Sequence, residues 1–152
     1  FEYVLIMILA QLPGYVCAAW LIERLGRKAT LASFITACAI SAYLFGQADS
    51  MFSVMVWGCL MSFFNLGAWG VLYTYTPEQY PANIRAFGAG WASAIGRIGG
   101  IAAPIVVTHM MVGHNGFHQV FMMFTLVLLA VALVIVVLGE ETQGKTLESI
   151  GL

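Results

Sequence analysis

The sequence has 152 residues, of which 61% are hydrophobic and only 9% are charged, and its formal net charge is −1. A water-soluble domain usually carries about 25% charged residues, so this composition excludes an ordinary soluble surface and predicts a membrane protein. The near-neutral charge provides no basic patch, so we expect no nucleic-acid partner.

Five apolar stretches, each long enough to cross about 30 Å of hydrocarbon as a helix, are residues 1–22, 29–47, 51–76, 87–112 and 117–138. Backbone groups in lipid must be satisfied internally, and these stretches are too long for barrel strands. The sequence therefore predicts an all-α membrane protein, with a transmembrane bundle over residues 1–138. Because Phe1 lies inside an apolar run, we expect the chain to be part of a longer protein.

The segments between these spans alternate in positive charge. Segments 47–50 and 113–116 contain no Lys or Arg. The basic residues outside the spans lie in the other connections and near the end of the chain, namely Arg24, Arg27, Lys28, Arg85 and Lys145. Because Lys and Arg concentrate on the cytoplasmic side of membranes, we expect residues 139–152 to form a cytoplasmic C-terminal tail.

The first span combines a helix-breaking pair with two polar side chains. Pro13 and Gly14 are expected to weaken or kink the helix, as is Pro104 in the fourth span, because Pro lacks the backbone N–H. Gln11 and Tyr15 lie one turn apart beside this break. A substrate cavity or packing between helices would explain that pair, so both residues are candidate substrate contacts.

A polar and aromatic stripe follows one face of the third span. Its residues recur at spacings of three and four: Gly58, Ser62, Asn65, Trp69, Tyr73 and Thr76. Trp69 and Tyr73 could stack on a planar substrate while Asn65 offers amide donors. Aromatic residues near helix ends are also typical of the membrane interface, and we interpret Tyr75 in that way.

Arg97 lies about ten residues into the fourth span, roughly 15 Å along the helix and so near the membrane midplane. No Asp or Glu of this sequence is expected at comparable depth. Arg97 shares its face with mostly small residues, namely Gly90, Ser93, Ala94, Ile101 and Pro104. It could bind an anionic substrate or gate its passage. Alternatively it pairs with a carboxylate or backbone carbonyls to fix helix packing.

Three histidines, His109, His114 and His118, cluster near the last turn between spans, but their spacing matches no zinc pattern. The sequence contains no nucleophile–base constellation and no phosphate-binding glycine loop. We therefore expect no metal site, no cofactor and no enzymatic activity.

Three motifs occur in order in the charged segments. Residues 23–28 read ERLGRK and look like the D/E-R-x-G-R-R/K loop of one transporter family. Residues 77–90 read PEQYPANIRAFGAG and look like its P-E-x-x-P-T-x-x-R-x-x-G-x-G segment, with Ala82 in place of Thr. Residues 140–148 read EETQGKTLE and are similar to its P-E-T-K-G-x-x-L-E motif, with Glu140 in place of Pro and Gln143 in place of Lys.

By these motifs the chain resembles the major facilitator superfamily, in the metabolite:proton symporter branch that includes sugar porters, aromatic-acid carriers and bacterial niacin transporters. The resemblance implies that the five spans are transmembrane helices 8 to 12, without helix 7 and the N-terminal half. Members of this family bind substrate between two halves and move it by alternating access. The missing half is therefore an expected partner of this chain.

The resemblance also assigns the charged motifs to an intracellular network that closes the inner side of the transporter. Its members here are Glu23, Arg24, Gly26, Arg27, Lys28, Glu78, Arg85, Glu141 and Glu148. The arginines can pair with the glutamates as the two halves approach, and they must separate when the cavity opens inward. A simple positive-inside anchor is the alternative interpretation of these charges.

The resemblance also reduces the number of substrate classes that we expect. Sugar porters usually carry G-P-x-P-W where residues 67–70 read GAWG, so a sugar is less expected. Residues 96–104 read GRIGGIAAP and look like the G-R-x-G-x-x-x-x-P pattern of carriers for aromatic acids, niacin and organic ions. Because a guanidinium group matches a carboxylate, we expect an aromatic carboxylate such as nicotinate or a benzoate, moved with protons across a bacterial inner membrane. The alternatives are a sugar:proton symporter and a channel or packing subunit without carrier activity.

Overall fold

The computed structural model describes residues 2–112 and 115–142, and every regular element in these ranges is an α-helix. In chain order the helices are α1 (Glu2–Leu9), α2 (Gln11–Leu25), α3 (Arg27–Gly46), α4 (Met51–Glu78), α5 (Arg85–Met111) and α6 (Gly116–Leu138). Helices α1 and α2 together make one candidate span, Glu2–Leu25, and the other four helices make one each. The predicted all-helical fold with five spans is therefore confirmed.

The first span is interrupted between α1 and α2, and Pro13 explains where. Pro13 has no N–H, and its ring collides with the carbonyl four residues earlier, which belongs to Leu9, the last residue of α1. The backbone N–H of Ala10 still donates to the carbonyl of Ile6, 3.0 Å away, so the two helices continue each other. Helix α5 runs through Pro104 without such an interruption.

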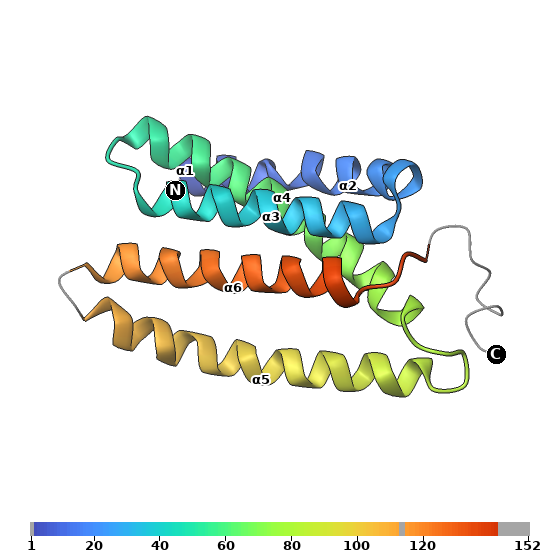
Figure 1. Ribbon diagram of the computed structural model, residues 1–152. Coiled ribbons are helices and arrows are strands. Elements are labelled where there is room, and N and C mark those ends of the chain that lie inside the picture. Colours follow the sequence, from blue (N-terminus) through green and yellow to red (C-terminus); the bar gives the residue numbers. More distant parts are fainter. Residues whose placement is uncertain (1, 113–114, 143–152) are drawn as a thin grey trace.

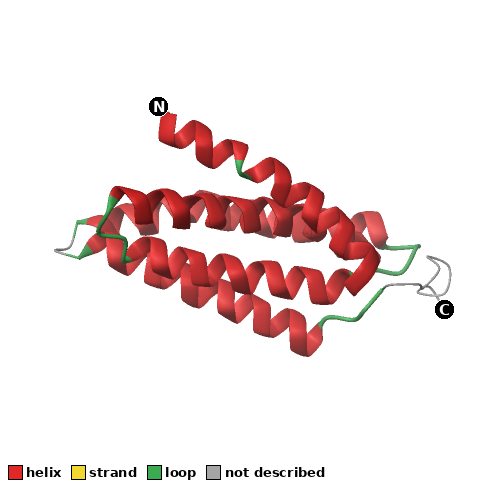
Figure 2. Ribbon diagram, turned by 90° about the horizontal axis from the view of Figure 1, so that it is seen from above, coloured by secondary structure: helices red, strands yellow, loops and turns green. Residues whose placement is uncertain are grey.

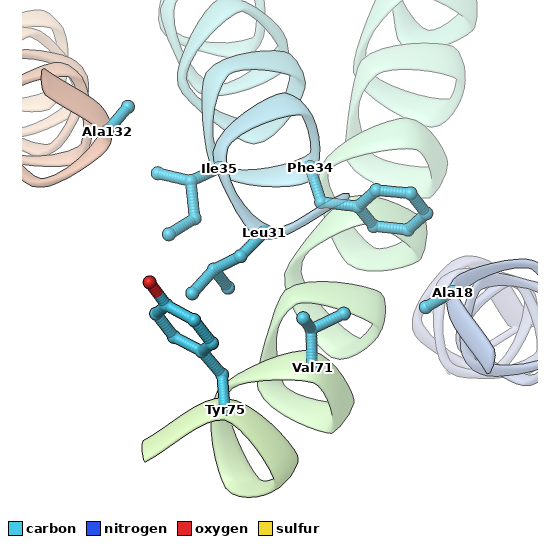
Figure 3. Close-up of a cluster of buried hydrophobic side chains, with 7 residues drawn as sticks. All are labelled: Ala18, Leu31, Phe34, Ile35, Val71, Tyr75 and Ala132. Carbon is cyan, nitrogen blue, oxygen red and sulfur yellow. The ribbon is translucent and has the colours of Figure 1, made fainter. Parts of the chain in front are cut away.

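Helix α3 lies at the centre of the bundle, where it packs against α4 and α6 (Figure 1). Leu31 and the neighbouring residues of α3 meet side chains from α2, α4 and α6 in one buried cluster (Figure 3). The cluster consists of Ala18, Leu31, Phe34, Ile35, Val71, Tyr75 and Ala132. Its apolar packing fixes how these four helices lie against one another.

Two glycines allow the backbones of α2 and α4 to touch. A Cβ atom on Gly14 would overlap the carbonyl oxygen of Phe63, and one on Gly67 would overlap the ring of Phe34. The same Cβ on Gly67 would lie 3.0 Å from the carbonyl oxygen of Gly14. Small residues permit such close helix crossings in membranes, so this contact sets the position of α2 on α4.

Helix α5 is the least buried of the five spans. Within the described residues it packs mainly beside α6, and none of its residues is buried (Figure 1). A Cβ built on Gly90, Gly96, Gly99 or Gly100 would meet no described atom within 4 Å. The small-residue face of α5 that carries Arg97 is therefore open.

Candidate functional site: a charge cluster at one end and an open aromatic face

The turns of the structure divide into two groups at opposite ends of the bundle. The turn at Gly26 and segments 79–84 and 139–142 lie at one end, whereas turn 47–50, the end of α5 and the start of α6 lie at the other (Figures 1 and 2). Arg24, Arg27, Lys28 and Arg85 thus share one end, as the alternation of positive charge predicted.

Gly26 makes the tight turn between α2 and α3. Its φ of 90° and ψ of 169° lie in a region that residues with a side chain rarely adopt, and no other described residue has a positive φ. The buried hydroxyl of Thr30 donates to the Gly26 carbonyl at 2.7 Å. Because Gly26 has no side chain, the first N–H groups of α3 need an acceptor from elsewhere.

The carboxylate of Glu141 is that acceptor. The backbone N–H of Arg27 donates to its Oε1 at 2.9 Å, and that of Lys28 donates to its Oε2 at 3.2 Å. A carboxylate in this position also interacts favourably with the partial positive charge of the helix N-terminus. The start of α3 and the segment after α6, which are far apart in the sequence, are thereby joined at one end of the bundle.

Glu78, at the end of α4, contacts both the start of α3 and the segment after α6, the same two segments that Glu141 joins. Its Oε2 lies 3.4 Å from Nε of Arg27, and the two side chains are 17% and 25% exposed. The hydroxyl of Thr142 donates to the same carboxylate oxygen. The pair Arg27–Glu78 expected from the sequence is thus formed within this chain, without a second half.

A short segment after α6, residues 139–142, forms most of these contacts, and we call it the C-terminal strap. The hydroxyl of Tyr75 donates to the carbonyl of Glu140 at 2.7 Å, and the Gln79 amide donates to the same carbonyl at 3.2 Å. A Cβ on Gly139 would lie 2.6 Å from the Tyr75 hydroxyl oxygen. Tyr75 is only 5% exposed, so our interfacial interpretation of it was wrong.

The remaining members of the expected network are placed differently. The guanidinium of Arg24 lies over the Trp20 ring at 5.2 Å from its centroid. Arg85 Nε donates to the carbonyl oxygens of Pro77 and Tyr80, at 3.0 and 3.3 Å, and so binds the end of α4. Glu23 is exposed, and Lys28 contributes its backbone N–H. Glu148 lies outside the described residues.

Arg97 projects from an uncovered part of α5. It is exposed, and it forms no ion pair or hydrogen bond with any residue in ranges 2–112 and 115–142. In those ranges it also makes no cation–π contact with the aromatic residues of α4. The structure thus leaves the guanidinium accessible and does not join it directly to the other candidate substrate contacts.

The expected stripe on α4 is open along its aromatic part. Trp69 and Tyr73 are 48% and 72% exposed, and their ring centroids lie 5.4 Å apart with an interplanar angle of 32°. Asn65, one turn earlier, is exposed but also interacts with the thiol of Cys38 on α3. Asn65 therefore has a packing contact in addition to any contact with substrate.

The two candidates on α2 differ in their surroundings. Tyr15 is half-exposed, and its ring lies against Gly70 of α4, the residue that follows Trp69 in the stripe. Gln11 is partly buried one turn earlier on α2. The structure therefore brings Tyr15 to the aromatic stripe.

Several contributing residues escaped the analysis of the sequence. Thr142, Gln79 and Gly139 act through the strap, and Gly70 acts by its lack of a side chain. Their signal was weak, because a hydroxyl, an amide and two glycines carry no charge pattern.

Near the opposite end, a pocket of about 370 Å³ is lined by Met110, His118, Gln119, Met122, Met123, Leu126 and Val127. Within the described ranges no group of three His, Cys, Asp or Glu could hold a metal ion.

Comparison with known proteins accounts for these motifs. Residues 3–151 match the sequence profile of the Major Facilitator Superfamily. The chain is 89% identical over 152 residues to the niacin transporter NiaP of Acinetobacter baylyi, covering 100% of this chain and 35% of that protein. It is 53% identical over 148 residues to a putative niacin/nicotinamide transporter of Bacillus subtilis, covering 97% of this chain and 37% of that protein.

A more distant relative is organic cation/carnitine transporter 7 of Arabidopsis thaliana, 34% identical over 145 residues. That match covers 91% of this chain and 27% of the relative. The chain thus spans about a third of the length of these relatives. With its five spans and its full-length profile match, the chain belongs to the major facilitator superfamily.

Proposed function

We propose that this chain forms the C-terminal part of a secondary transporter that carries nicotinate, or a closely related small aromatic carboxylate, across the bacterial inner membrane. The observation that carries the proposal is the 89% identity with the Acinetobacter baylyi niacin transporter over all 152 residues. Because the chain spans 35% of that relative, the activity belongs to the whole transporter, in which an N-terminal half supplies the other side of the substrate site.

Arg97 binds the carboxylate of the substrate in this proposal. An ionised side chain in the middle of a span is costly unless it meets an opposite charge or water, and Arg97 has no acidic partner among the described residues. Its face of α5 is open and lined by small residues, which leaves room for a ligand. A planar guanidinium can donate two parallel hydrogen bonds to a carboxylate, which orients the substrate as well as attracting it.

The aromatic ring of the substrate rests on the exposed rings of α4. Trp69 and Tyr73 offer flat surfaces, and Asn65 and Gln11 add polar groups near them. Stacked or edge-to-face aromatic contacts contribute about 0.5–1.5 kcal/mol beyond burial of apolar area. Such contacts favour a pyridine or benzene ring over a sugar, whose hydroxyl groups need many more hydrogen-bond partners.

The charge cluster makes the cytoplasmic end of this half move as one body. Arg27, Glu78 and Glu141 are bound to one another through α3, α4 and the C-terminal strap, so they keep their contacts while the two halves rock. The exposed guanidinium of Arg24 is available to the N-terminal half when the inner side closes. This arrangement divides the expected network into an internal brace and an outer contact, with the C-terminus in the cytoplasm.

Proton coupling is part of the proposal and rests on the family resemblance. Among the described residues the acids lie near the ends of the spans, away from the depth of Arg97. We therefore place the acid that carries the proton in the part of the transporter outside this chain.

Uptake by proteoliposomes that contain the full-length transporter tests the function. We expect saturable uptake of radiolabelled nicotinate that is stimulated by an imposed proton gradient, inhibition by benzoate, and no uptake of glucose. Uptake of glucose alone would support the sugar:proton symporter alternative instead. Flux that does not saturate and ignores the gradient would support a channel instead.

A further inference from the structure

The ring of Tyr15 occupies space that exists only because residue 70 is glycine. A Cβ atom on Gly70 would lie 2.9 Å from Cε2 of Tyr15 and 3.3 Å from Cζ. Any other residue at position 70 would therefore push this ring away from α4. The other side of the ring is open, since Tyr15 is 53% exposed.

Gly70 is flanked by the two exposed rings of α4. Trp69 precedes it directly, and Tyr73 follows after three residues, about one helical turn. These two rings are in contact with each other, and Tyr15 brings a third ring, from a different helix, against Gly70, which lies between them in the sequence. We call Tyr15, Trp69 and Tyr73 the aromatic wall.

The nearby helix crossing holds this wall in place. Gly14, the neighbour of Tyr15, abuts the backbone of α4 at Phe63, and Gly67 closes the same contact one turn before Gly70. Neither backbone can withdraw without opening the crossing. The crossing thus fixes the spacing of the two backbones that carry Tyr15 and the rings of α4.

Asn65 indicates that this face of α4 lies against protein or a wet cavity and not against lipid. Asn65 lies one turn before Trp69 on the same face of α4, and its side chain is exposed. An amide that faces hydrocarbon loses hydrogen bonds to water without replacement, so such residues generally line protein contacts or wet cavities.

We infer that Gly70 is a positioning residue for ring selectivity: it lets Tyr15 complete an aromatic wall that distinguishes a flat ring from a puckered one. The inference rests on the proposed transport of an aromatic carboxylate and adds the residue that shapes its ring site. Gly70 touches no substrate itself and acts through Tyr15.

Two matched inhibitors isolate this effect in the full-length transporter. Benzoate and cyclohexanecarboxylate carry the same charge on six-membered rings of similar size, but only benzoate is flat. We expect benzoate to compete with nicotinate uptake more strongly in the wild type. Gly70→Ala should raise the KM for nicotinate and weaken benzoate competition by about three- to tenfold, the range of one lost aromatic contact. Competition by cyclohexanecarboxylate should stay unchanged.

Tyr15→Leu, which keeps Gly70, should reproduce the loss of ring selectivity and keeps the inference testable if Gly70→Ala does not fold. The double variant Gly70→Ala/Tyr15→Leu should be no worse than either single variant, because both remove the same contact. Tyr43→Leu is the control, since it removes a half-exposed tyrosine ring from α3, which carries none of the proposed substrate contacts.

The outcomes separate the inference from the function on which it rests. Wild-type transport of nicotinate with unchanged benzoate selectivity in folded Gly70→Ala or in Tyr15→Leu would overturn the inference alone. Losses that multiply in the double variant would overturn the action of Gly70 through Tyr15. A wild-type transporter that takes up no aromatic carboxylate would overturn both.

Discussion

The backbone N–H of Arg27 donates to the side chain of Glu141 across 114 residues of sequence, at 2.9 Å. The carboxylate therefore caps a helix to which it is not adjacent in the chain, and it stands in for the side chain that Gly26 lacks. Local sequence around α3 gives no sign of this cap. Its consequences can be measured by changing single residues of the full-length transporter.

Replacing Glu141 should destabilise the end of the bundle at which Gly26 lies. Glu141→Ala removes the acceptor for two N–H groups and should lower the free energy of unfolding by about 0.5–2 kcal/mol, the usual cost of a lost helix cap. Glu141→Gln keeps an acceptor oxygen and loses only the charge, so it should cost less. Thermal unfolding in detergent measures both. Asp49→Asn, at the opposite end of the bundle, is the control and should leave the transition where it is.

The ion pair between Arg27 and Glu78 should contribute measurably because both side chains are largely buried. We expect a double-mutant cycle of Arg27→Gln and Glu78→Gln to give a coupling free energy of about 0.5–1 kcal/mol, near the upper end for pairs in contact with water. Thr142→Val should also couple to Glu78→Gln, since its hydroxyl donates to that carboxylate. Additive effects in both cycles would contradict the contacts described.

Gly139 should be intolerant of even a methyl group. Gly139→Ala would place a Cβ 2.6 Å from the Tyr75 hydroxyl oxygen and 2.5 Å from the Ile135 carbonyl oxygen. We expect a loss of stability of about 1–3 kcal/mol, which is typical of overpacking. Tyr75→Phe should cost about 1 kcal/mol by itself through its lost hydrogen bond, and it should relieve part of the Gly139→Ala defect. Thermal unfolding of the double variant provides the comparison.

Replacing Arg97 should weaken the binding of carboxylate substrates in particular. Arg97→Gln should reduce the affinity for nicotinate by at least about tenfold, because a charge-assisted hydrogen bond contributes about 1.5–3 kcal/mol. Arg97→Lys keeps the charge but loses the bidentate geometry, so its loss should be smaller. Competition by nicotinamide, which has the same ring without a carboxylate, should change little. Unchanged nicotinate affinity in both variants would mean that Arg97 has a packing role.

The helical architecture could be predicted from the sequence because hydrocarbon permits few alternatives. The apolar lengths determine the spans, and Pro13 even explains the break after Leu9. The charged motifs indicated the family because residue types and their spacing can be read from the sequence without knowing which residues are in contact. Arg27 and Glu78 were expected to meet, but only the structure showed that they meet inside one half of the transporter.

The contacts that sequence reasoning missed depend on distance in space. Tyr75 looks like an interfacial aromatic residue until the strap brings the Glu140 carbonyl to its hydroxyl. Gly70 looks like one small residue among many until α2 crosses α4 and places Tyr15 against it. Both depend on which helices become neighbours, and apolar periodicity says little about that when most faces of a span are hydrophobic.

The long-range cap of α3 also has a consequence for the order of events during synthesis. Translation proceeds at about 5–20 residues per second, so roughly 6–23 s pass between the appearance of Arg27 and that of its acceptor. During this time the first turn of α3 depends on water for its hydrogen bonds. A ribosome that stops before residue 141 leaves α3 uncapped. The truncated product then has a less stable helix start that cellular proteases can recognise.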